Sequence, residues 1–137
     1  MTELERRSRL IEVAGGRRRA DLVIKGAKVI DVLNAQIIEG DVAVADGLIA
    51  GIGTYEGERE FDAGGRYLAP GFIDAHVHIE SSLVDPASFS ELVVPHGTTT
   101  VIADPHEICN VCGLDGLDYM LSFSKDLPLS IFLMIKH

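Results

Sequence analysis

The sequence predicts an α/β protein in which a small antiparallel β domain, β-sandwich-like, precedes parallel strands joined by crossover helices. Short apolar runs separated by glycine-rich turns fill residues 20–67, whereas β-prone runs alternate with helical patterns from residue 68 onward. Hydrophobic residues make up 47% of the 137 residues and charged residues 24%, which is typical of a globular protein with a core. We therefore expect a helix and linker (1–19), a β domain (20–67) and a β/α region (68–137).

The first segment has the signals of a short amphipathic helix. Thr2 and Glu5 have the spacing of a capping box, and Gly15 is placed to end the helix. Leu4, Ser8 and Ile11 would share the buried face.

The β domain is expected to contain a tight hairpin. Asp46-Gly47 separates two apolar runs, which is the strongest short-range hairpin signal. Upstream, Gly26 splits residues 21–30 into two short strands.

The β/α region has the order strand, helix, strand, helix, strand. Asp85 is placed to cap the first helix and Pro86 to begin it. The order implies parallel strands with crossover helices, with the elements expected at 71–76, 86–94, 98–103, 114–124 and 129–135.

Charge and composition exclude several classes of function. The formal net charge of -9 argues against nucleic acid as a partner, because phosphate binding needs a basic surface. No apolar run is long enough to span a membrane, and no secretory signal is apparent, so we expect a cytoplasmic protein. Cys109 and Cys112 are too few for a disulfide framework and are expected to be half-buried structural thiols. The sequence leaves open whether the protein forms a homo-oligomer.

The strongest chemical signal is the string Pro70-Gly-Phe-Ile-Asp-Ala-His76-Val-His78. Two histidines at i and i+2 of a strand point to the same side, so both can bind one metal. Neutral imidazole is a good ligand for Zn, Mn or Fe. The alternative is two ordinary histidines at the end of a strand.

This string resembles the first barrel strand of the amidohydrolase superfamily. Residues 78–82 (His-Ile-Glu-Ser-Ser) and 95–108 (from Pro-His-Gly-Thr-Thr-Thr to Asp-Pro-His-Glu-Ile) are similar to the adenine deaminase family in particular, as is the opening at 15–24. The resemblance implies a (β/α)₈ barrel of the TIM type and a divalent, binuclear metal centre of Mn, Fe or Zn, with His76 and His78 as ligands. It also implies hydrolysis of a purine base, adenine, to hypoxanthine and ammonia, as in purine salvage.

A second polar cluster, Asp104, His106 and Glu107, follows the strand at 98–103 and should face the same barrel mouth. These side chains could bind metal, relay protons or contact the purine, and we take them as candidate catalytic residues. The alternative is a polar loop with a helix cap. Glu80 and Ser81 are expected to line the pocket or to support a histidine from behind.

Three alternatives stay open. A (β/α)₈ barrel takes about 250 residues, so residues 68–137 have room for about three of its strands. We therefore expect an unfinished barrel that is inactive alone. The first alternative is that the chain is a truncated product with no catalytic role. A different cyclic amidohydrolase, dihydroorotase-like or imidazolonepropionase-like, is the second. The third is a cytidine-type zinc deaminase, since His78-Ile-Glu80 and Cys109-x-x-Cys112 follow in that order, but Ile108 replaces the expected proline.

Overall fold

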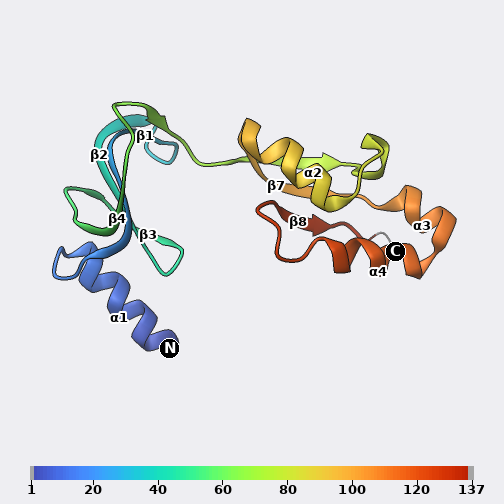
Figure 1. The fold of residues 1–137 in the computed structure, drawn as a ribbon, viewed down its shortest axis with the longest axis horizontal. Coiled ribbons are helices and arrows are strands. Elements are labelled where there is room, and N and C mark those ends of the chain that lie inside the picture. Colours follow the sequence, from blue (N-terminus) through green and yellow to red (C-terminus); the bar gives the residue numbers. More distant parts are fainter. Residues whose placement is uncertain (1, 136–137) are drawn as a thin grey trace. The chain divides into compact units, whose positions relative to one another are not determined.

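The computed structural model describes residues 2–135, which divide between Pro70 and Gly71 into two compact units, 2–70 and 71–135. Residue 1, where the expected helix segment began, and residues 136–137, where the expected β/α region ended, lie outside the described residues. Figure 1 shows helix α1 and a strongly bent sheet in the first unit, and a parallel sheet with helices in the second. Each unit is described by itself below.

The first unit contains one five-stranded sheet, in the order β3-β2-β1-β4 with β5 also paired to β1. Strands β1, β2 and β3 are antiparallel neighbours, but β4 and β5 run parallel to β1. The prediction of an antiparallel domain is therefore wrong for β4 and β5, and the described strands do not form a second layer of a sandwich. The elements are α1 Glu3–Ala14, β1 Ala20–Asp31, β2 Gln36–Ala45, β3 Leu48–Gly53, β4 Gly57–Asp62 and β5 Tyr67–Leu68.

The predicted hairpin at Asp46-Gly47 is confirmed. Ala45 pairs with Leu48 across the turn. Asp46 and Gly47 have φ of 51° and 75°, which is the positive-φ pair that a type I′ turn requires.

The two short strands expected around Gly26 are one strand, β1. Its pairing with β2 shifts register between Ile24 and Ala27, and Gly26 adopts a φ of 59° there. A glycine in the left-handed region lets one extra residue bulge out while the strand continues. The glycine therefore marks a bulge and not a strand end.

Helix α1 has the predicted capping box, because the Glu5 N–H donates to Thr2 Oγ1 at 3.2 Å and the Thr2 N–H donates to Glu5 Oε2 at 2.6 Å. The predicted buried face is wrong, since Leu4 is 74% and Ile11 63% exposed. Val13 and Leu10 pack on the sheet instead.

The cause is a polar anchor on α1 that the apolar pattern does not reveal. Arg9 forms ion pairs with Asp21 and Asp46, and Arg6 donates to the Asp46 carbonyl. Positions 6, 9, 10 and 13 share one helical face, so these contacts turn that face toward the sheet.

The second unit is a three-stranded parallel sheet in the order β6-β7-β8, with helices in the crossovers. The alternation of strands and helices is as predicted, and the Asp85 carboxylate caps α2 by accepting from the Ser88 N–H at 2.7 Å. Helix α3 was not expected. The elements are β6 Phe72–Val77, η1 Glu80–Ser82, α2 Pro86–Val93, η2 Val94–His96, β7 Thr98–Ala103, α3 His106–Cys112, α4 Leu114–Phe123 and β8 Ser130–Leu133.

The core of this unit lies between the sheet and the helices. It consists of six buried apolar side chains: Ile79, Phe89, Val101, Ala103, Met120 and Leu129. Ile79 and Ala103 directly neighbour His78 and Asp104 in sequence, so packing fixes the backbone from which those polar side chains project. In residues 2–135, none of the helices combines the length and the apolar character needed to cross a membrane.

Candidate metal centre

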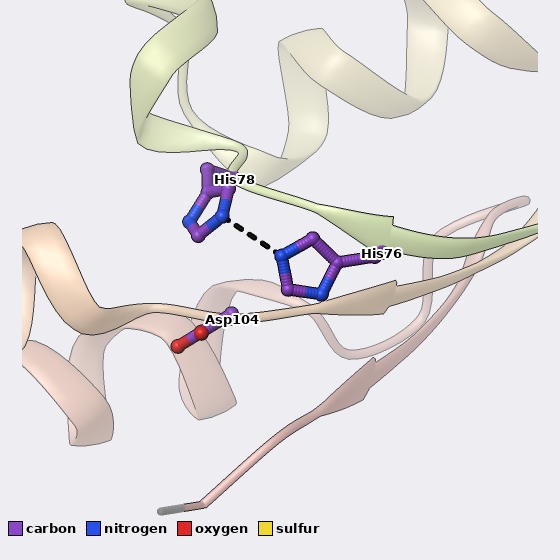
Figure 2. Close-up of side chains that lie close together, drawn as sticks. All are labelled: His76, His78 and Asp104. Atoms are coloured by element: carbon purple, nitrogen blue, oxygen red, sulfur yellow. Dashed lines mark hydrogen bonds between the residues drawn. The ribbon is translucent and has the colours of Figure 1, made fainter.

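The end of β6 brings His76 and His78 together. The two Nε2 atoms are 3.1 Å apart, and the ring centroids are separated by 4.9 Å with the planes inclined at 76°. Figure 2 shows both imidazoles projecting from the same stretch of chain toward each other. The predicted convergence of the two rings is therefore observed.

Asp104 approaches the same point from the neighbouring strand. The Asp104 N–H donates to the Val77 carbonyl at 2.9 Å, which aligns the end of β7 with the end of β6. Asp104 is buried, 2% exposed, and the ligand atoms of His76, His78 and Asp104 lie within 4.8 Å of one another. Figure 2 places its carboxylate beside the two rings.

A second group of three donors contains His78 again, together with His106 and Glu107 from the start of α3. His78 Nδ1 is 3.2 Å from Glu107 Oε2, and the His78 and His106 ring centroids are 4.7 Å apart. His106 Nδ1 is in turn 3.4 Å from Asp104 Oδ2. His78 is thus the residue that joins the two groups.

The Glu107 carboxylate is held in its ionised form. The Ser81 hydroxyl donates to Glu107 Oε1 at 2.8 Å, and this hydrogen bond is the main reason that the pKa of Glu107 is below its usual range. The electrostatic effects of the nearby His78 and His106 lower the pKa of Glu107 as well, but by less than the Ser81 hydrogen bond. At neutral pH Glu107 is therefore an acceptor, able to hold an imidazole N–H or a cation.

Glu80 contacts α3 and not the histidines. The Ile108 N–H donates to Glu80 Oε1 at 3.4 Å, while Glu80 Oε2 is buried and has no hydrogen-bond partner among residues 2–135. The prediction was that Glu80 and Ser81 line the pocket or support a histidine from behind. The observed contacts are one step further away, since Ser81 touches Glu107, which faces His78, and Glu80 touches the helix that carries Glu107.

Sequence reasoning missed α3 and the cavity beside it. The cavity has a volume of about 470 Å³, and its wall includes Asp104, His106, Cys109 and Asn110. The signals for α3 were present, since Glu107 lies in its first turn and Gly113 follows its last residue. In the sequence, the same residues also fit a polar cluster followed by a Cys-x-x-Cys, and that pattern does not by itself predict a helix. The prediction of two half-buried thiols is wrong for Cys112, which is exposed.

The donor set fits a divalent transition metal. Two imidazoles and a carboxylate are common ligands of Zn, Mn and Fe. Two nitrogens bound to one tetrahedral Zn at about 2.0–2.1 Å would be about 3.3 Å apart, which is close to the 3.1 Å between the two Nε2 atoms.

The chain is similar to curated adenine deaminases over most of its length. It is 61% identical over 127 residues to adenine deaminase 2 of Desulfotalea psychrophila, 60% over 125 residues to adenine deaminase of Bacillus pumilus, and 51% over 133 residues to that of Archaeoglobus fulgidus. These matches cover 93%, 91% and 97% of this chain but only 22%, 22% and 24% of the relatives. The chain therefore spans less than a quarter of the length of these relatives.

A family profile gives the same assignment. The profile described as "Amidohydrolase family" matches residues 67–137, about half of the chain. The matched range contains every candidate site residue, from His76 to Glu107. The chain belongs to the amidohydrolase family.

Proposed function

We propose that this chain supplies part of the metal centre of an enzyme that hydrolyses adenine to hypoxanthine and ammonia. The observation that carries the proposal is the convergence of His76, His78 and Asp104 at the ends of two adjacent parallel strands. The names of the relatives indicate the substrate, a purine base.

The contacts of His78 suggest how it would act. A neutral imidazole has one N–H and one lone pair, and the other hydrogen bond decides which nitrogen is which. The Glu107 carboxylate faces Nδ1 and is best satisfied by an Nδ1–H, which leaves the lone pair on Nε2, the atom beside His76. Carboxylates in this arrangement orient a histidine ligand and strengthen its donor nitrogen.

We therefore assign His76 Nε2, His78 Nε2 and Asp104 to one divalent metal, with Glu107 orienting His78. A bound divalent metal would lower the pKa of a water molecule, so that a hydroxide nucleophile forms near neutral pH. The second donor group of the described residues is His78, His106 and Glu107, and a metal held there would take Glu107 away from its contact with His78. The described residues thus favour one metal, and the binuclear centre stays a prediction.

Deamination also needs a group that moves a proton from the attacking water to the departing ammonia. Among Asp104, His106 and Glu107, we favour His106. Its side chain is 46% exposed and its Nδ1 lies beside Asp104, whereas Asp104 and Glu107 are assigned to the metal and to His78.

A chimera tests the proposed function. The segment of the Desulfotalea psychrophila relative that matches this chain would be replaced by this chain, and ammonia release from adenine would be measured with Mn, Fe or Zn present. We expect activity that is lost in His76→Ala and in His78→Ala. A folded chimera whose activity survives both substitutions would refute the assignment.

We expect the 137-residue chain by itself to be inactive. His76 is exposed and the neighbouring cavity is open to solvent, so the described residues do not exclude water from the metal or position a purine over it. Turnover equal to that of the chimera would show that this expectation is wrong.

A further inference from the structure

The two cysteines of the chain lie one helical turn apart on α3, outside the candidate metal groups. Cys109 is half-buried and Cys112 is exposed, and both are free thiols. Cys112 is the last residue of α3 and Cys109 lies in its middle. We propose that Cys109 and Cys112 form a reversible intramolecular disulfide, so that α3 carries a thiol modification site.

The spacing brings the two sulfurs within reach. Residues at i and i+3 of a helix have Cβ atoms about 5–6 Å apart, and a disulfide needs about 3.5–4.5 Å. Closure therefore takes a movement of about 1–2 Å, which the interior of a rigid helix would resist.

The end of α3 can provide that movement. Gly113 follows Cys112 with φ 60° and ψ −139°. Apart from its two chain neighbours, no described residue has an atom within 4 Å of the position that a Cβ would take on it. The Gly113 N–H donates to the Cys109 carbonyl at 2.8 Å in this last turn. Rearranging it leaves the first turn, which carries His106 and Glu107, with its own bond from the Cys109 N–H to the Pro105 carbonyl at 3.1 Å.

The difference in exposure fixes the order of reaction. With glutathione disulfide as the oxidant, the exposed Cys112 sulfur attacks one glutathione sulfur, and the first glutathione leaves as a thiol. Cys109 then attacks the Cys112 sulfur, the mixed disulfide breaks, and the second glutathione leaves. Two cysteine thiols lose two electrons and two protons, and one glutathione disulfide becomes two glutathione thiols.

Mass spectrometry of the intact chain tests the proposal. We expect the chain treated with glutathione disulfide to lose the mass of two hydrogen atoms, with no free thiol left and no dimer formed, and dithiothreitol to reverse the change. Because this measurement needs no substitution, it does not depend on the folding of a variant. A stable glutathione adduct or a linked dimer as the main product would overturn the proposal.

Two single substitutions test the order of reaction. Cys109→Ser is expected to accumulate a glutathione adduct at Cys112 at the rate at which the unsubstituted chain forms its disulfide. Cys112→Ser keeps only the half-buried thiol and is expected to react about tenfold more slowly. Equal adduct rates in the two variants, with circular dichroism spectra unchanged, would contradict the assignment of Cys112 as the attacking thiol.

Discussion

At the scale of single residues, the two histidines of the strand motif differ in how well they are supported. His78 is held on both sides, since its Nε2 meets His76 and its Nδ1 meets Glu107. His76 is exposed, and its ring contacts His78. A metal bound here would thus have one preorganised nitrogen ligand and one that depends on its neighbour.

This difference leads to a prediction for metal affinity. His78→Ala removes a ligand and frees Glu107, so we expect Mn or Zn to bind at least about 100-fold more weakly, because even outer partners of a ligand contribute about 10–100-fold. His76→Ala should cost less than His78→Ala. The measurement is calorimetric titration of the metal into the 137-residue chain.

The control for this experiment is His96→Ala. His96 ends η2, is exposed and lies outside both donor groups. Its replacement should leave the affinity unchanged, and an equal loss in all three variants would indicate nonspecific binding to surface histidines.

A second prediction concerns the Ser81 hydroxyl. It is the main cause of the lowered pKa of Glu107, and Ser81 is itself exposed. In Ser81→Ala the pKa of Glu107 should rise toward its ordinary value of about 4.3, with little change in stability. NMR titration of the metal-free chain measures this, with Ser88→Ala as the control. An unchanged titration of Glu107 would mean that the Ser81 contact is absent in solution.

At the scale of elements, α3 depends on a neighbouring segment for its first turn. Its N-cap residue is Pro105, which makes no side-chain cap, and the Glu80 carboxylate accepts from the Ile108 N–H instead. The contact is long, 3.4 Å, but a helix of two turns has few other restraints. Glu80 and Ser81 together attach η1 to α3 and so position Glu107.

We therefore expect Glu80→Ala to loosen α3 while Glu80→Gln, which keeps an acceptor oxygen, largely preserves it. The direct readout is hydrogen exchange of the Ile108 amide, which should become several-fold faster in Glu80→Ala. Metal affinity should fall in the same variant, because Glu107 moves with the helix. If exchange at Ile108 is the same in Glu80→Ala and in the unsubstituted chain, Glu80 does not position α3.

Elements with local signals could be predicted from the sequence. The Thr2–Glu5 box, the Asp46-Gly47 turn and the Asp85-Pro86 helix start each depend on residues within four positions, and each is observed. The approach of His76 and His78 is of the same kind, because it needs only their i, i+2 spacing at the end of one strand.

Features that depend on distant partners could not be predicted in this way. The parallel pairing of Ala20 with Gly57 joins segments 37 residues apart, and nothing in either segment specifies strand direction. The face of α1 was misassigned because Arg9 is anchored by Asp21 and Asp46. The contact between Ser81 and Glu107 likewise required the alignment of β6 with β7.

At the scale of the whole molecule, each unit has its own core, and the candidate site depends on that of the second unit. Met120, 1% exposed, packs in the cluster that contains Ile79 and Ala103. Met120→Ala should lower the free energy of unfolding by about 2–5 kcal/mol. Leu121→Ala is the matched control, since Leu121 is the next residue of α4 and is 44% exposed. Urea unfolding of both variants compares them, and equal losses would contradict the assignment of Met120 to the core.

The stability of the whole molecule is also expected to depend on pH. Five carboxyl groups, distributed over both units, have a pKa below the ordinary value, mainly because hydrogen-bond donors face them: Asp21, Asp31, Asp41, Asp85 and Glu107. A group whose pKa is lower in the folded state contributes stability above its unfolded pKa and loses it as the pH falls through the folded value. The net charge of -9 acts in the opposite sense, because partial protonation first relieves repulsion. We therefore expect stability to hold from pH 7 to about pH 5 and to fall below about pH 4.

A substitution of Asp41 is the best single test of this expected loss of stability at acid pH. It is buried and accepts from Lys25 Nζ at 2.7 Å, from the Gly26 N–H at 3.0 Å and from the Tyr55 N–H at 3.2 Å, and the Lys25 bond is the main cause of its lowered pKa. Asp41→Asn keeps the shape but loses the charge, so we expect it to cost about 1–3 kcal/mol at pH 7. The cost should shrink as the pH falls below about 4, because the unfolded unsubstituted chain then binds a proton on this carboxyl that the folded chain resists. The hydrogen bond to Asp41 raises the pKa of Lys25. A group with a raised pKa contributes stability that is lost only as the pH rises through that pKa. Lys25 therefore does not contribute to the loss of stability at acid pH. Urea unfolding of Asp41→Asn and of the exposed control Asp118→Asn between pH 3 and pH 8 makes the comparison. A loss that is the same at both ends of this range would mean that Asp41 acts through packing and not through its charge.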